Sequence, residues 1–357
     1  MSHQIDENIL VTGGGGFLGS AIVKRLVKLG APVASFSRNK HTELTSLNVP
    51  QIQGDISDPD AVERAVRGKN AVFHVAAKPG VWGAYRDYYL PNVAGTQNVI
   101  AACLKHGVSR LVHTSSPSVV FDGSDMEGVD ESTPYPRRFH SHYPQTKALA
   151  EQAVVQASGA KLKTIILRPH LIWGPGDNHL VPRIIARASQ LRQVGDGQNK
   201  TDTIYIDNAA DAHILAAEKL AANAALSGRI YFISQGKPIL LWEMINAILN
   251  AADLPPVQKT ISHRTAWMIG ACLESVYKLF KIANEPRMTR FVADELAASH
   301  WFDISAARRD LGYYPKVSTQ EGLERLAVWL KTDLASPFMD YRCGASKPER
   351  SIQPIKT

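Results

Sequence analysis

A cluster of glycines near the start of the chain constrains the fold more than any other feature. The segment Val11–Gly19 reads V-T-G-G-G-G-F-L-G and follows the short β-rich run Ile9–Val11. Gly13, Gly16 and Gly19 match the pattern G-x-x-G-x-x-G, and an amphipathic stretch begins directly after them. A helix N-terminus presents unpaired N–H groups, and residues without a Cβ let a pyrophosphate approach them closely. The context therefore predicts a dinucleotide-binding turn, with a purely structural turn as the alternative.

Short apolar runs alternate with helical patterns through the first 170 residues. The runs that read as strands are Ile9–Val11, Val33–Phe36, Ala71–Val75, Arg110–Thr114 and Thr164–Leu167. The helical stretches include Ala21–Leu29, Asn92–Lys105 and Tyr143–Ala157. Such alternation implies an α/β fold in which helices cover both faces of a parallel sheet. We expect a doubly wound Rossmann sheet, whose ligand binds beyond the carboxyl ends of the strands.

The alternation weakens after Gly174, which predicts a smaller C-terminal portion that binds the substrate. We expect residues 1–177 and 205–223 to form the dinucleotide-binding domain, and residues 178–204 and 224–335 to form the substrate-binding portion. Residues 336–357 are expected to be a loose tail. The hydrophobic stretch Thr265–Ile282 contains three charged residues, so we expect a helix packed on the substrate-binding portion. A helix that contacts a membrane surface or a partner is the alternative.

Bulk composition is that of an ordinary globular protein. The formal net charge of +7 favours anionic ligands, but its sources are spread along the chain and do not imply nucleic-acid binding. Cys103, Cys272 and Cys343 lie far apart, which argues against a disulfide framework and against a cysteine-based metal site. The first residues lack the basic-then-apolar order of a signal peptide, so a cytoplasmic location is expected.

The end of the second strand predicts the coenzyme. NAD-specific sites usually carry an acid there, which holds the ribose 2′-hydroxyl. This chain instead has Ser37 and Arg38, with Lys40 close by. A guanidinium can pair with phosphate oxygens at two points, so this segment favours NADP(H); an arginine that merely solvates a loop is the alternative. Asp55 and Ile56 follow the third strand, where a carboxylate can accept from the adenine amine or cap the next helix.

Tyr143 and Lys147 lie four residues apart at the start of a predicted helix, and therefore on one face. A phenol has an ordinary pKa of about 10, and a neighbouring ammonium favours the phenolate. The pair can thus act in proton transfer, although an isolated Y-x-x-x-K is common on surface helices. The strand that ends at Thr114 is followed by Ser115, Ser116 and Ser118. Each of these three hydroxyls is a candidate donor to a substrate carbonyl oxygen.

Together these motifs resemble the extended short-chain dehydrogenase/reductases. The resemblance rests on T-G-G-G-G-F-L-G, G-D-I, N-V-A-G-T-Q-N, T-S-S-P-S-V, Y-x-x-x-K and L-R-P-x-x-I-W-G-P-G, and it covers nearly the whole chain. The chain is most similar to the 3β-hydroxysteroid dehydrogenase branch, and within it to bacterial reductases of 2-alkyl-3-oxoalkanoic acids. The second similarity rests on A-K-P-G-V-W-G-A-Y, G-P-G-D-N-H-L-V-P-R and T-R-F-V-A-D-E-L with S-H-W-F.

The resemblance implies a role for each matching residue. Tyr143 would donate the proton in reduction, Lys147 would hold the nicotinamide ribose and tune Tyr143, and Ser116 would orient the carbonyl. Asn92 matches a family position beside the cofactor, with an N-cap of the following helix as the alternative. The remaining implied cofactor contacts are Gly13, Gly16, Phe17, Leu18, Gly19, Ser37, Arg38, Asp55, Ile56, Ala76, Ala77, Lys78, Pro169, His170 and Ile172.

Several further residues are candidates for the substrate pocket. Trp82, Tyr85, Trp173 and His179 lie in predicted loops after strand ends, where a long apolar substrate can sit, and ordinary packing is the alternative for each. Arg183 either pairs with a substrate carboxylate or caps and solvates its own helix. His140 and His142 could hold a metal, but no third ligand has a suitable spacing, so we expect solvated loop histidines and no metal.

The resemblance implies an oxidoreductase that reduces 2-alkyl-3-oxo acids to 2-alkyl-3-hydroxy acids with NADPH, as in long-chain olefin biosynthesis. The alternatives are a 3β-hydroxysteroid or sterol-carboxylate dehydrogenase, a nucleotide-sugar epimerase with tightly held NAD, and a regulatory protein without turnover. The expected partner is a small lipid-like β-keto acid, not nucleic acid. Family likeness also implies a homodimer, and contact with a membrane surface or with pathway enzymes stays open.

Overall fold

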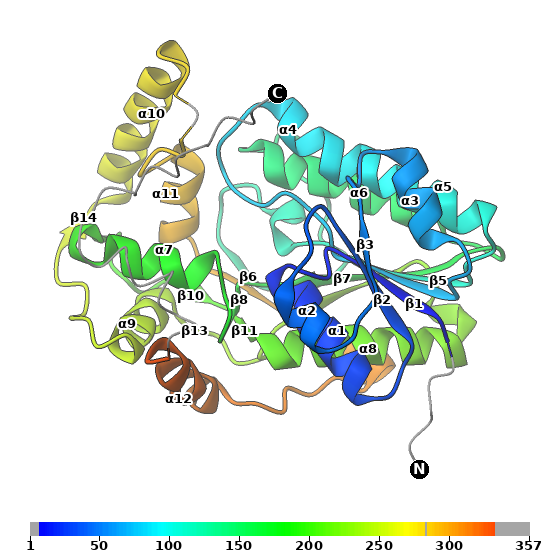
Figure 1. Cartoon of the computed structure of the whole chain (residues 1–357). Helices are drawn as coiled ribbons and strands as arrows, with labels where there is room; N and C mark the ends of the chain where they lie inside the picture. Colours follow the sequence, from blue (N-terminus) through cyan, green and yellow to red (C-terminus); the bar gives the residue numbers. More distant parts are fainter. Residues whose placement is uncertain (1–6, 283, 333–357) are drawn as a thin grey trace, which may run out of the picture.

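A seven-stranded parallel sheet occupies the centre of the computed structural model, which describes residues 7–282 and 284–332 (Figure 1). Its strands are β1 (Ile9–Thr12), β2 (Val33–Ser37), β3 (Gln51–Gln53), β4 (Ala71–His74), β5 (Arg110–Thr114), β7 (Lys163–Pro169) and β12 (Arg229–Ile233). Their order across the sheet is β12-β7-β5-β4-β1-β2-β3, with every neighbouring pair parallel. The strands β2 and β3 lie on one side of β1, whereas β4 lies on its other side. The order therefore reverses between β1 and β4, and a ligand crevice is expected beyond the carboxyl ends of these two strands. The prediction of a doubly wound sheet is confirmed.

Helices cover both faces of this sheet because its strands are apolar on both sides. In β1, Ile9 and Val11 join one buried cluster and Leu10 joins the other. The first cluster lies under α1 (Phe17–Lys28), α2 (Thr42–Ser46) and α8 (Ile206–Ala222). The second lies under α3 (Pro59–Val66), α5 (Gly95–Lys105) and α6 (His142–Ala157). Figure 1 shows these two helical layers on opposite sides of the strands.

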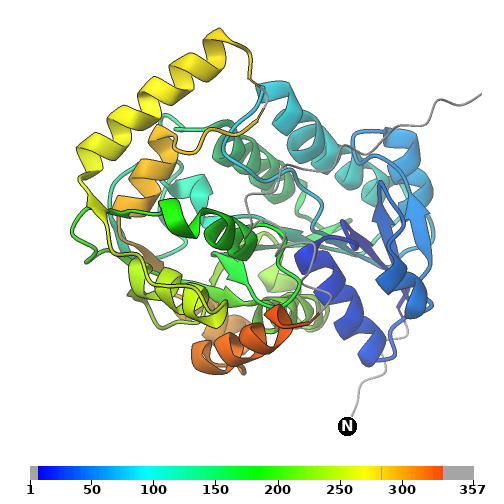
Figure 2. The same cartoon turned by 60° about the vertical axis from the view of Figure 1, so that its left-hand side comes forward.

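The smaller portion is built from short strands and helices at one end of the main sheet (Figure 2). A four-stranded sheet has the order β13 (Ile239–Leu240), β10 (Lys200–Thr201), β15 (His300–Phe302) and β6 (Met126–Val129). Two pairs accompany it: β8 (Ile172–Trp173) with β11 (Ile204–Tyr205), and β9 (Gln193–Val194) with β14 (Thr260–Ile261). Its helices are α7 (Leu180–Arg187), α9 (Leu241–Ala251), α10 (His263–Leu279), α11 (Arg290–Ala297) and α12 (Thr319–Leu330).

Short helical segments complete the connections. They are α4 (Tyr85–Tyr89), the π-helical turns η1 (Leu90–Ala94) and η5 (Ala307–Leu311), and the 3₁₀ turns η2 (Pro117–Val120), η3 (Ala188–Gln190) and η4 (Ala224–Leu226). The segments α4, η1 and α5 follow one another without a break, so the helix at residues 85–105 contains a π-helical turn. Such turns are often found at functional sites.

Two segments depart from the predicted division of the chain. The strand Arg229–Ile233 pairs with β7 along its whole length and is therefore an edge strand of the main sheet, although the sequence placed residues 224–335 in the substrate-binding portion. Conversely, β6 lies within the predicted dinucleotide-binding segment but pairs with β15 of the smaller sheet. Sequence periodicity predicts a strand at Arg229–Ile233 but not its neighbour, and it predicts no strand at Met126–Val129. The predicted tail, 336–357, lies outside the described residues.

The hydrophobic stretch Thr265–Ile282 forms most of α10, as predicted. Only Ala266, Gly270 and Glu274 of this helix are buried, whereas Met268 and Leu279 are exposed. The packed-helix prediction therefore holds for one narrow face of α10. No helix within residues 7–282 and 284–332 is long and apolar enough to cross a membrane.

Candidate active site

The glycine turn lies directly against the end of β4. Gly13 has a φ of 70°, and a Cβ at this position would stand 2.9 Å from the Ala76 nitrogen. A Cβ on Gly19 would stand 2.1 Å from the Gly13 carbonyl oxygen. Both positions therefore require glycine, because any side chain would push the turn away from β4 or break the first turn of α1. The structure thus brings together Gly13, Gly19 and Ala76 as expected.

The N-terminus of α1 points its unpaired N–H groups out of this turn. Gly16 is the N-cap residue and makes no side-chain cap, and the first helical turn, from Phe17, contains no acidic residue. Leu18 and Gly19 are buried, whereas Phe17 is partly exposed. An uncapped helix start next to a side-chain-free turn matches the needs of a dinucleotide pyrophosphate. The residues present therefore fit the cofactor that the motif implies.

The loop after β2 lies beside the same turn. Ser37 Oγ donates to the Asn39 carbonyl at 2.8 Å, and Arg38 is exposed. The His41 ring covers Gly15 so closely that a Cβ there would lie 2.0 Å from it. A hollow of about 250 Å³ between the two loops is lined by Gly15, Ser20, Lys40, His41, Thr42, Glu43 and Leu44. His41 was not among the residues predicted for this site, although its position directly after Lys40 was a signal for it.

Asp55 and Ile56 have different surroundings although they are adjacent. Hydrogen bonds from the Ser57 side chain and backbone, and then the charge of Arg38, lower the pKa of the exposed Asp55 carboxyl. Ile56 is buried, and its side chain touches Gly95 of α5. Asp58 caps α3 by accepting from the backbone N–H groups of residues 60 and 61. The capping role is therefore taken by Asp58, which leaves the Asp55 carboxylate at the surface near Arg38.

Tyr143 and Lys147 lie in the first turns of α6, and the structure ties both to the end of β5. Lys147 is buried, and its Nζ donates to the Thr114 carbonyl at 2.5 Å. The Ser116 side chain lies near enough to the Tyr143 hydroxyl to lower the pKa of that phenol. Ser116 also caps η2, where its Oγ lies 2.9 Å from Ser118 Oγ. The three predicted catalytic residues therefore form one cluster, and Ser116 is the hydroxyl that lies near Tyr143.

Burial acts in opposite directions on the two titrating groups. It lowers the pKa of Lys147 to about 8, although the Glu151 carboxylate raises it in part. Burial raises the pKa of Tyr143, the Ser116 side chain lowers it, and the charge of Glu295 raises it. A protonated phenol and an ammonium that is close to losing its proton suit a site that donates a proton near neutrality.

A hydrogen-bonded chain connects the glycine turn to the helix of Tyr143. Thr12 Oγ1 lies 2.8 Å from His74 Nδ1, and His74 Nε2 lies 2.9 Å from Thr96 Oγ1. Thr96 donates onward to the Asn92 carbonyl at 2.6 Å, and Asn92 Nδ2 donates to Thr146 Oγ1 at 3.0 Å. Because the Thr96 hydroxyl donates its proton to the Asn92 carbonyl, the Thr96 oxygen accepts from His74 Nε2. The neutral His74 ring therefore carries its proton on Nε2. Burial, and then the charge of Lys147, lower the pKa of His74 to about 3.

Asn92 has a structural role different from the predicted N-cap. It lies inside the π-helical turn η1, is buried, and exchanges two hydrogen bonds with the backbone of Lys78, at 2.7 and 3.2 Å. It therefore fixes the loop of Ala77 and Lys78, which are expected to line the cofactor site. The capping alternative is wrong because the helix continues through this residue without interruption.

The segment after β7 lies beside the end of β12. Pro169 is the last residue of β7, and the His170 N–H donates to the Ile233 carbonyl at 3.2 Å. Ile172 pairs with Ile204 in the two-stranded sheet. The main-chain contacts that the resemblance implies at Pro169, His170 and Ile172 thus belong to a segment that crosses the carboxyl edge of the sheet.

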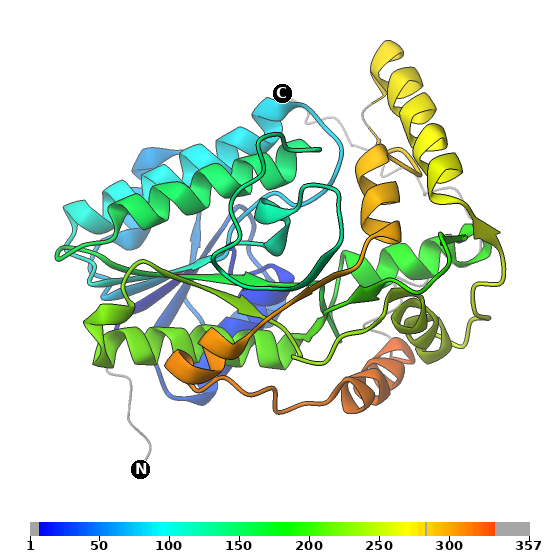
Figure 3. The same ribbon diagram turned by 180° about the vertical axis from the view of Figure 1, so that it is seen from behind.

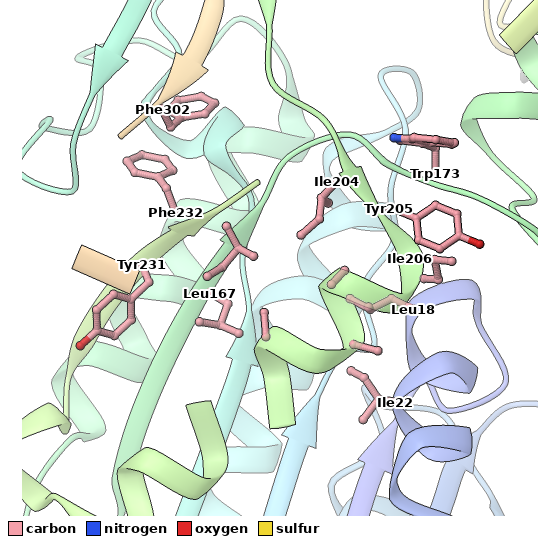
Figure 4. Close-up of a cluster of buried hydrophobic side chains, with 14 of the residues drawn as sticks. Leu18, Ile22, Leu167, Trp173, Ile204, Tyr205, Ile206, Tyr231, Phe232 and Phe302 are labelled. Atoms are coloured by element: carbon pink, nitrogen blue, oxygen red, sulfur yellow. The ribbon is translucent and has the colours of Figure 1, made fainter. Parts of the chain in front are cut away.

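Two of the proposed pocket residues have partners within the protein. Trp173 is fully buried, donates to Thr203 Oγ1 at 3.1 Å and packs edge-on against Tyr205, so it is a core residue (Figure 4). Arg183 forms an ion pair with Glu285, and its side chain is 41% exposed, which is compatible with the alternative that it solvates its own helix. The Arg183 guanidinium, which was predicted as a possible partner of a substrate carboxylate, thus already has a carboxylate partner in Glu285.

The other three pocket candidates lie near the surface of the molecule. Trp82 donates to the Ile282 carbonyl at 3.3 Å. The Tyr85 ring meets His142 edge-on at 5.5 Å, directly before Tyr143. His179 is exposed at the start of α7. Of these three, Tyr85 is the residue that contacts α6, the helix of Tyr143, through the His142 ring.

The two loop histidines have separate partners. His140 Nδ1 lies 3.4 Å from Asp294 Oδ2, whereas His142 faces the rings of Tyr85 and Tyr88. Throughout the described part of the chain, no group of three or more His, Cys, Asp or Glu side chains is arranged to hold a metal ion.

Glu295, on α11, is a residue of the site that sequence reasoning did not single out. Its charge acts on the Tyr143 hydroxyl from a helix that follows Tyr143 by about 150 residues. Burial raises the pKa of this carboxyl to about 7, against the lowering effect of Arg183. The only sequence signal was its place in the T-R-F-V-A-D-E-L segment that resembles the reductases.

Comparisons with known proteins agree with this geometry. The chain is 52% identical to the 2-alkyl-3-oxoalkanoate reductase of Stenotrophomonas maltophilia, over 89% of this chain and 98% of that protein. It is 48% identical to the reductase of the same name from Shewanella oneidensis, over 91% and 86%. It is 35% identical to the decarboxylating sterol-4-alpha-carboxylate 3-dehydrogenase of Schizosaccharomyces pombe, over 91% and 98%.

Solved structures share the fold over nearly the same length. The crystal structure of gox2253 matches with a TM-score of 0.74 and 26% identity, over 91% of this chain and 98% of that one. MoeE5 in complex with UDP-glucose and NAD matches with a TM-score of 0.71 and 26% identity, over 92% and 99%. The model of the 3-beta hydroxysteroid dehydrogenase/isomerase family matches residues 10–262. The chain therefore belongs to the 3-beta hydroxysteroid dehydrogenase/isomerase family, an oxidoreductase branch of the extended short-chain dehydrogenase/reductases.

Proposed function

We propose that this chain reduces 2-alkyl-3-oxoalkanoic acids to 2-alkyl-3-hydroxyalkanoic acids with NADPH, reversibly. The observation that carries the proposal is the cluster of Ser116, Tyr143 and Lys147 at the end of β5, beside the glycine turn. The substrate class is supported by the two bacterial relatives of that name, which are 52% and 48% identical.

A nicotinamide coenzyme held at the glycine turn would supply the hydride that reduces the ketone carbon. The hydroxyls of Ser116 and Tyr143 both donate to the ketone oxygen, where negative charge develops. Tyr143 then transfers its proton to that oxygen, and the nearby Lys147 ammonium stabilises the phenolate that remains. The Thr114 carbonyl holds Lys147 in place for this role.

NADP(H) is the proposed coenzyme because the loop after β2 is basic. Ser37 is the last residue of the strand, and Arg38 and Lys40 follow it. His41 lines the same hollow as Lys40, next to the glycine turn. A 2′-phosphate in that hollow would meet cations and hydroxyls, and no carboxylate directly follows β2 to repel it. Glu43 also lines the hollow, but it forms an ion pair with Lys24 at 2.5 Å.

Further parts of the proposal concern the setting of the enzyme. We propose that it acts in long-chain olefin biosynthesis, in the cytoplasm, and as a homodimer that pairs through long helices of the main domain. The division of the chain into a dinucleotide-binding domain and a substrate-binding portion is likewise proposed, with β12 moved to the former and β6 to the latter.

The proposal is tested by mixing purified protein with NADPH and one of three substrates, and following the loss of the reduced-cofactor absorbance. A 2-alkyl-3-oxo acid should be consumed, and NADH should support a lower rate. Faster turnover of a 3-ketosteroid would instead favour the sterol dehydrogenases, to which the chain is 35% identical. Conversion of UDP-glucose without net NADPH loss would favour an epimerase. Either result would overturn the proposed substrate class.

A further inference from the structure

The helix α10 presents an apolar face to the outside of the molecule. Its buried residues recur every four positions and mark the inward face: Ala266, Gly270 and Glu274. Two further residues along a helix turn it by about 200°, so Met268 and Val276 point the opposite way, and both are exposed. Figures 1 and 3 show α10 at the outer edge of the smaller portion, with α11 on its inner side. The outward face of α10 is thus open to a partner.

The apolar surface is largest at the C-terminal end of this helix. Leu279 is 76% exposed, and Phe280, the C-cap residue, is 70% exposed. Of the thirteen large hydrophobic side chains that are exposed in the described part of the chain, six lie between positions 267 and 280. Single exposed hydrophobic residues are normal on a protein surface, whereas a contiguous group of them marks a surface that binds an apolar partner.

The charges around this face are unbalanced. Residues 263–290 include five lysines or arginines but only two acids. Both acids are ion-paired, Glu274 with Arg290 at 2.7 Å and Glu285 with Arg183. The remaining cations of the segment are exposed and form no ion pair within the described residues: Arg264, Lys278, Lys281 and Arg287. The apolar face is therefore accompanied by positive charge that has no partner in this part of the protein.

We propose that α10 docks this protein on the surface of an anionic phospholipid bilayer. The helix lies in the plane of the surface, with Met268, Leu279 and Phe280 at the acyl boundary. Lys278 and Lys281 reach the phosphate headgroups, because long basic side chains keep their charge in the polar layer while their stems cover apolar surface. Docking suits the lipid-like substrate of the proposed function but does not rest on it, because the surface of α10 alone makes the contacts.

A second copy of this chain is the alternative occupant of the face. A two-fold contact between two α10 helices would place the same unpaired cations on both sides of the interface. Neither acid of residues 263–290 is free to meet them, because each is already paired. Like charges that face each other across an interface oppose binding. The charge pattern therefore favours anionic lipid over self-association.

The exposed end of α10 is also connected to the candidate active site. Trp82 donates to the Ile282 carbonyl at 3.3 Å and meets the Tyr277 ring edge-on at 6.0 Å. The Trp82 carbonyl accepts from the Tyr88 hydroxyl at 2.8 Å, and the Tyr88 ring lies 6.5 Å from that of His142, the first residue of α6. The docking surface is therefore joined by two side-chain contacts to the helix of the proposed catalytic residues.

The test measures co-sedimentation of the purified full-length protein with sucrose-loaded vesicles, in the absence of substrate. Vesicles of phosphatidylcholine with about 30% phosphatidylglycerol should bind the protein about tenfold or more tightly than vesicles of phosphatidylcholine alone. Addition of about 0.5 M NaCl should remove most of this difference, because salt screens the headgroup charge.

Two serine substitutions test the apolar contribution. The double variant Leu279→Ser with Phe280→Ser should raise the Kd for the anionic vesicles about tenfold or more, because it removes the most exposed apolar side chains of the face. The matched control is Tyr314→Ser with Val328→Ser, which removes two equally exposed hydrophobic side chains from another surface. It should bind as the wild type does.

Two glutamine substitutions test the charge contribution in the same way. Lys278→Gln with Lys281→Gln should raise the Kd for the anionic vesicles about tenfold or more. Lys161→Gln with Lys219→Gln removes the same charge from exposed positions elsewhere and should have little effect.

The wild type alone can overturn the proposal, whether or not every variant folds. Equal binding to both kinds of vesicle, or binding to neither, would contradict it, and so would equal losses in the α10 variants and their controls. A serine variant of α10 that changes the mass in sedimentation velocity, in a protein that ignores vesicles, would assign the face to a second copy. Vesicle binding is measured without turnover, so failure of the proposed function would leave this result unchanged.

Discussion

The Lys147 ammonium donates a hydrogen bond to the Thr114 carbonyl at 2.5 Å, and this contact joins the helix of Tyr143 to the strand that leads to Ser116. An ammonium has three donors, so this one bond leaves capacity for the hydroxyls of a bound ribose. The same lysine therefore positions the two halves of the proposed catalytic set relative to each other. The consequences can be measured one residue at a time.

Replacement of Tyr143 by phenylalanine should remove the proton donor and little else. We expect turnover to fall by about a hundred- to ten-thousandfold, while the Kd of NADPH stays close to that of the wild type. Steady-state kinetics and cofactor fluorescence titration measure the two quantities. Tyr314→Phe is the matched control, because Tyr314 is 65% exposed and should tolerate the change. Normal turnover in Tyr143→Phe would remove this residue from the mechanism.

Lys147 should titrate well below an ordinary lysine. Its ammonium is disfavoured by burial, which lowers the pKa to about 8, so the charge is lost as the pH rises through 8. One ¹³C signal from the lysine ε-carbons should titrate there, and it should be missing in Lys147→Met. With an uncharged methyl ester of the 2-alkyl-3-oxo acid as substrate, kcat/KM should decline above pH 8. A Lys147 signal that titrates near pH 10.5 would contradict the burial described here.

The coenzyme preference should depend on the end of β2. Ser37→Asp places a carboxylate where a 2′-phosphate is proposed to lie, so the KM of NADPH should rise about tenfold or more. The KM of NADH should fall or stay unchanged, because aspartate can accept from the ribose hydroxyls. Ser275→Asp, at an exposed position of α10, serves as the control. Equal effects of Ser37→Asp on both coenzymes would show that this position does not contact the phosphate.

The buried ion pair beneath the site should be costly to break. Arg168 Nε and Nη2 donate to the two oxygens of Glu151 at 3.0 and 2.6 Å, and both side chains are fully buried. Glu151→Gln leaves the guanidinium without a counter-charge, so the free energy of unfolding should fall by about 3–5 kcal/mol.

A second ion pair on the surface provides the control for that measurement. Arg325 and Glu321 lie one turn apart on α12, and each is 46% exposed. Glu321→Gln should cost about 0.3–0.5 kcal/mol, because water screens the pair. Urea unfolding of the two variants compares the two losses directly. Equal losses would mean that Arg168 finds another partner in the variant.

The sequence was sufficient for the features that depend on local pattern. The strand before Gly13 and the helix that begins at Tyr143 were both predicted, because hydrophobic periodicity and glycine spacing act over a few residues. The order Gly-rich turn, serine-rich strand end and Tyr/Lys helix then placed Ser116 with its neighbours. Ser116 could not be separated from Ser115 and Ser118 until its position near Tyr143 was known.

What the sequence could not supply are contacts between distant segments. Trp173 looked like a loop aromatic, but its ring is buried against Tyr205 in the core. Arg183 was expected to meet a substrate carboxylate or its own helix, but it pairs with Glu285, 102 residues further along the chain. Glu295 lies on a short helix with no motif of its own, and only the packing of α11 on the catalytic segment brings it near Tyr143.

The central claim is that hydride passes from NADPH to the ketone carbon of a 2-alkyl-3-oxo acid beside Ser116 and Tyr143. The most direct measurement supplies NADPH that carries deuterium on both faces of nicotinamide C4 and analyses the product by mass spectrometry. The product should be the 2-alkyl-3-hydroxy acid with one deuterium, on C3. A hydroxy acid without deuterium, or no hydroxy acid at all, would contradict the claim.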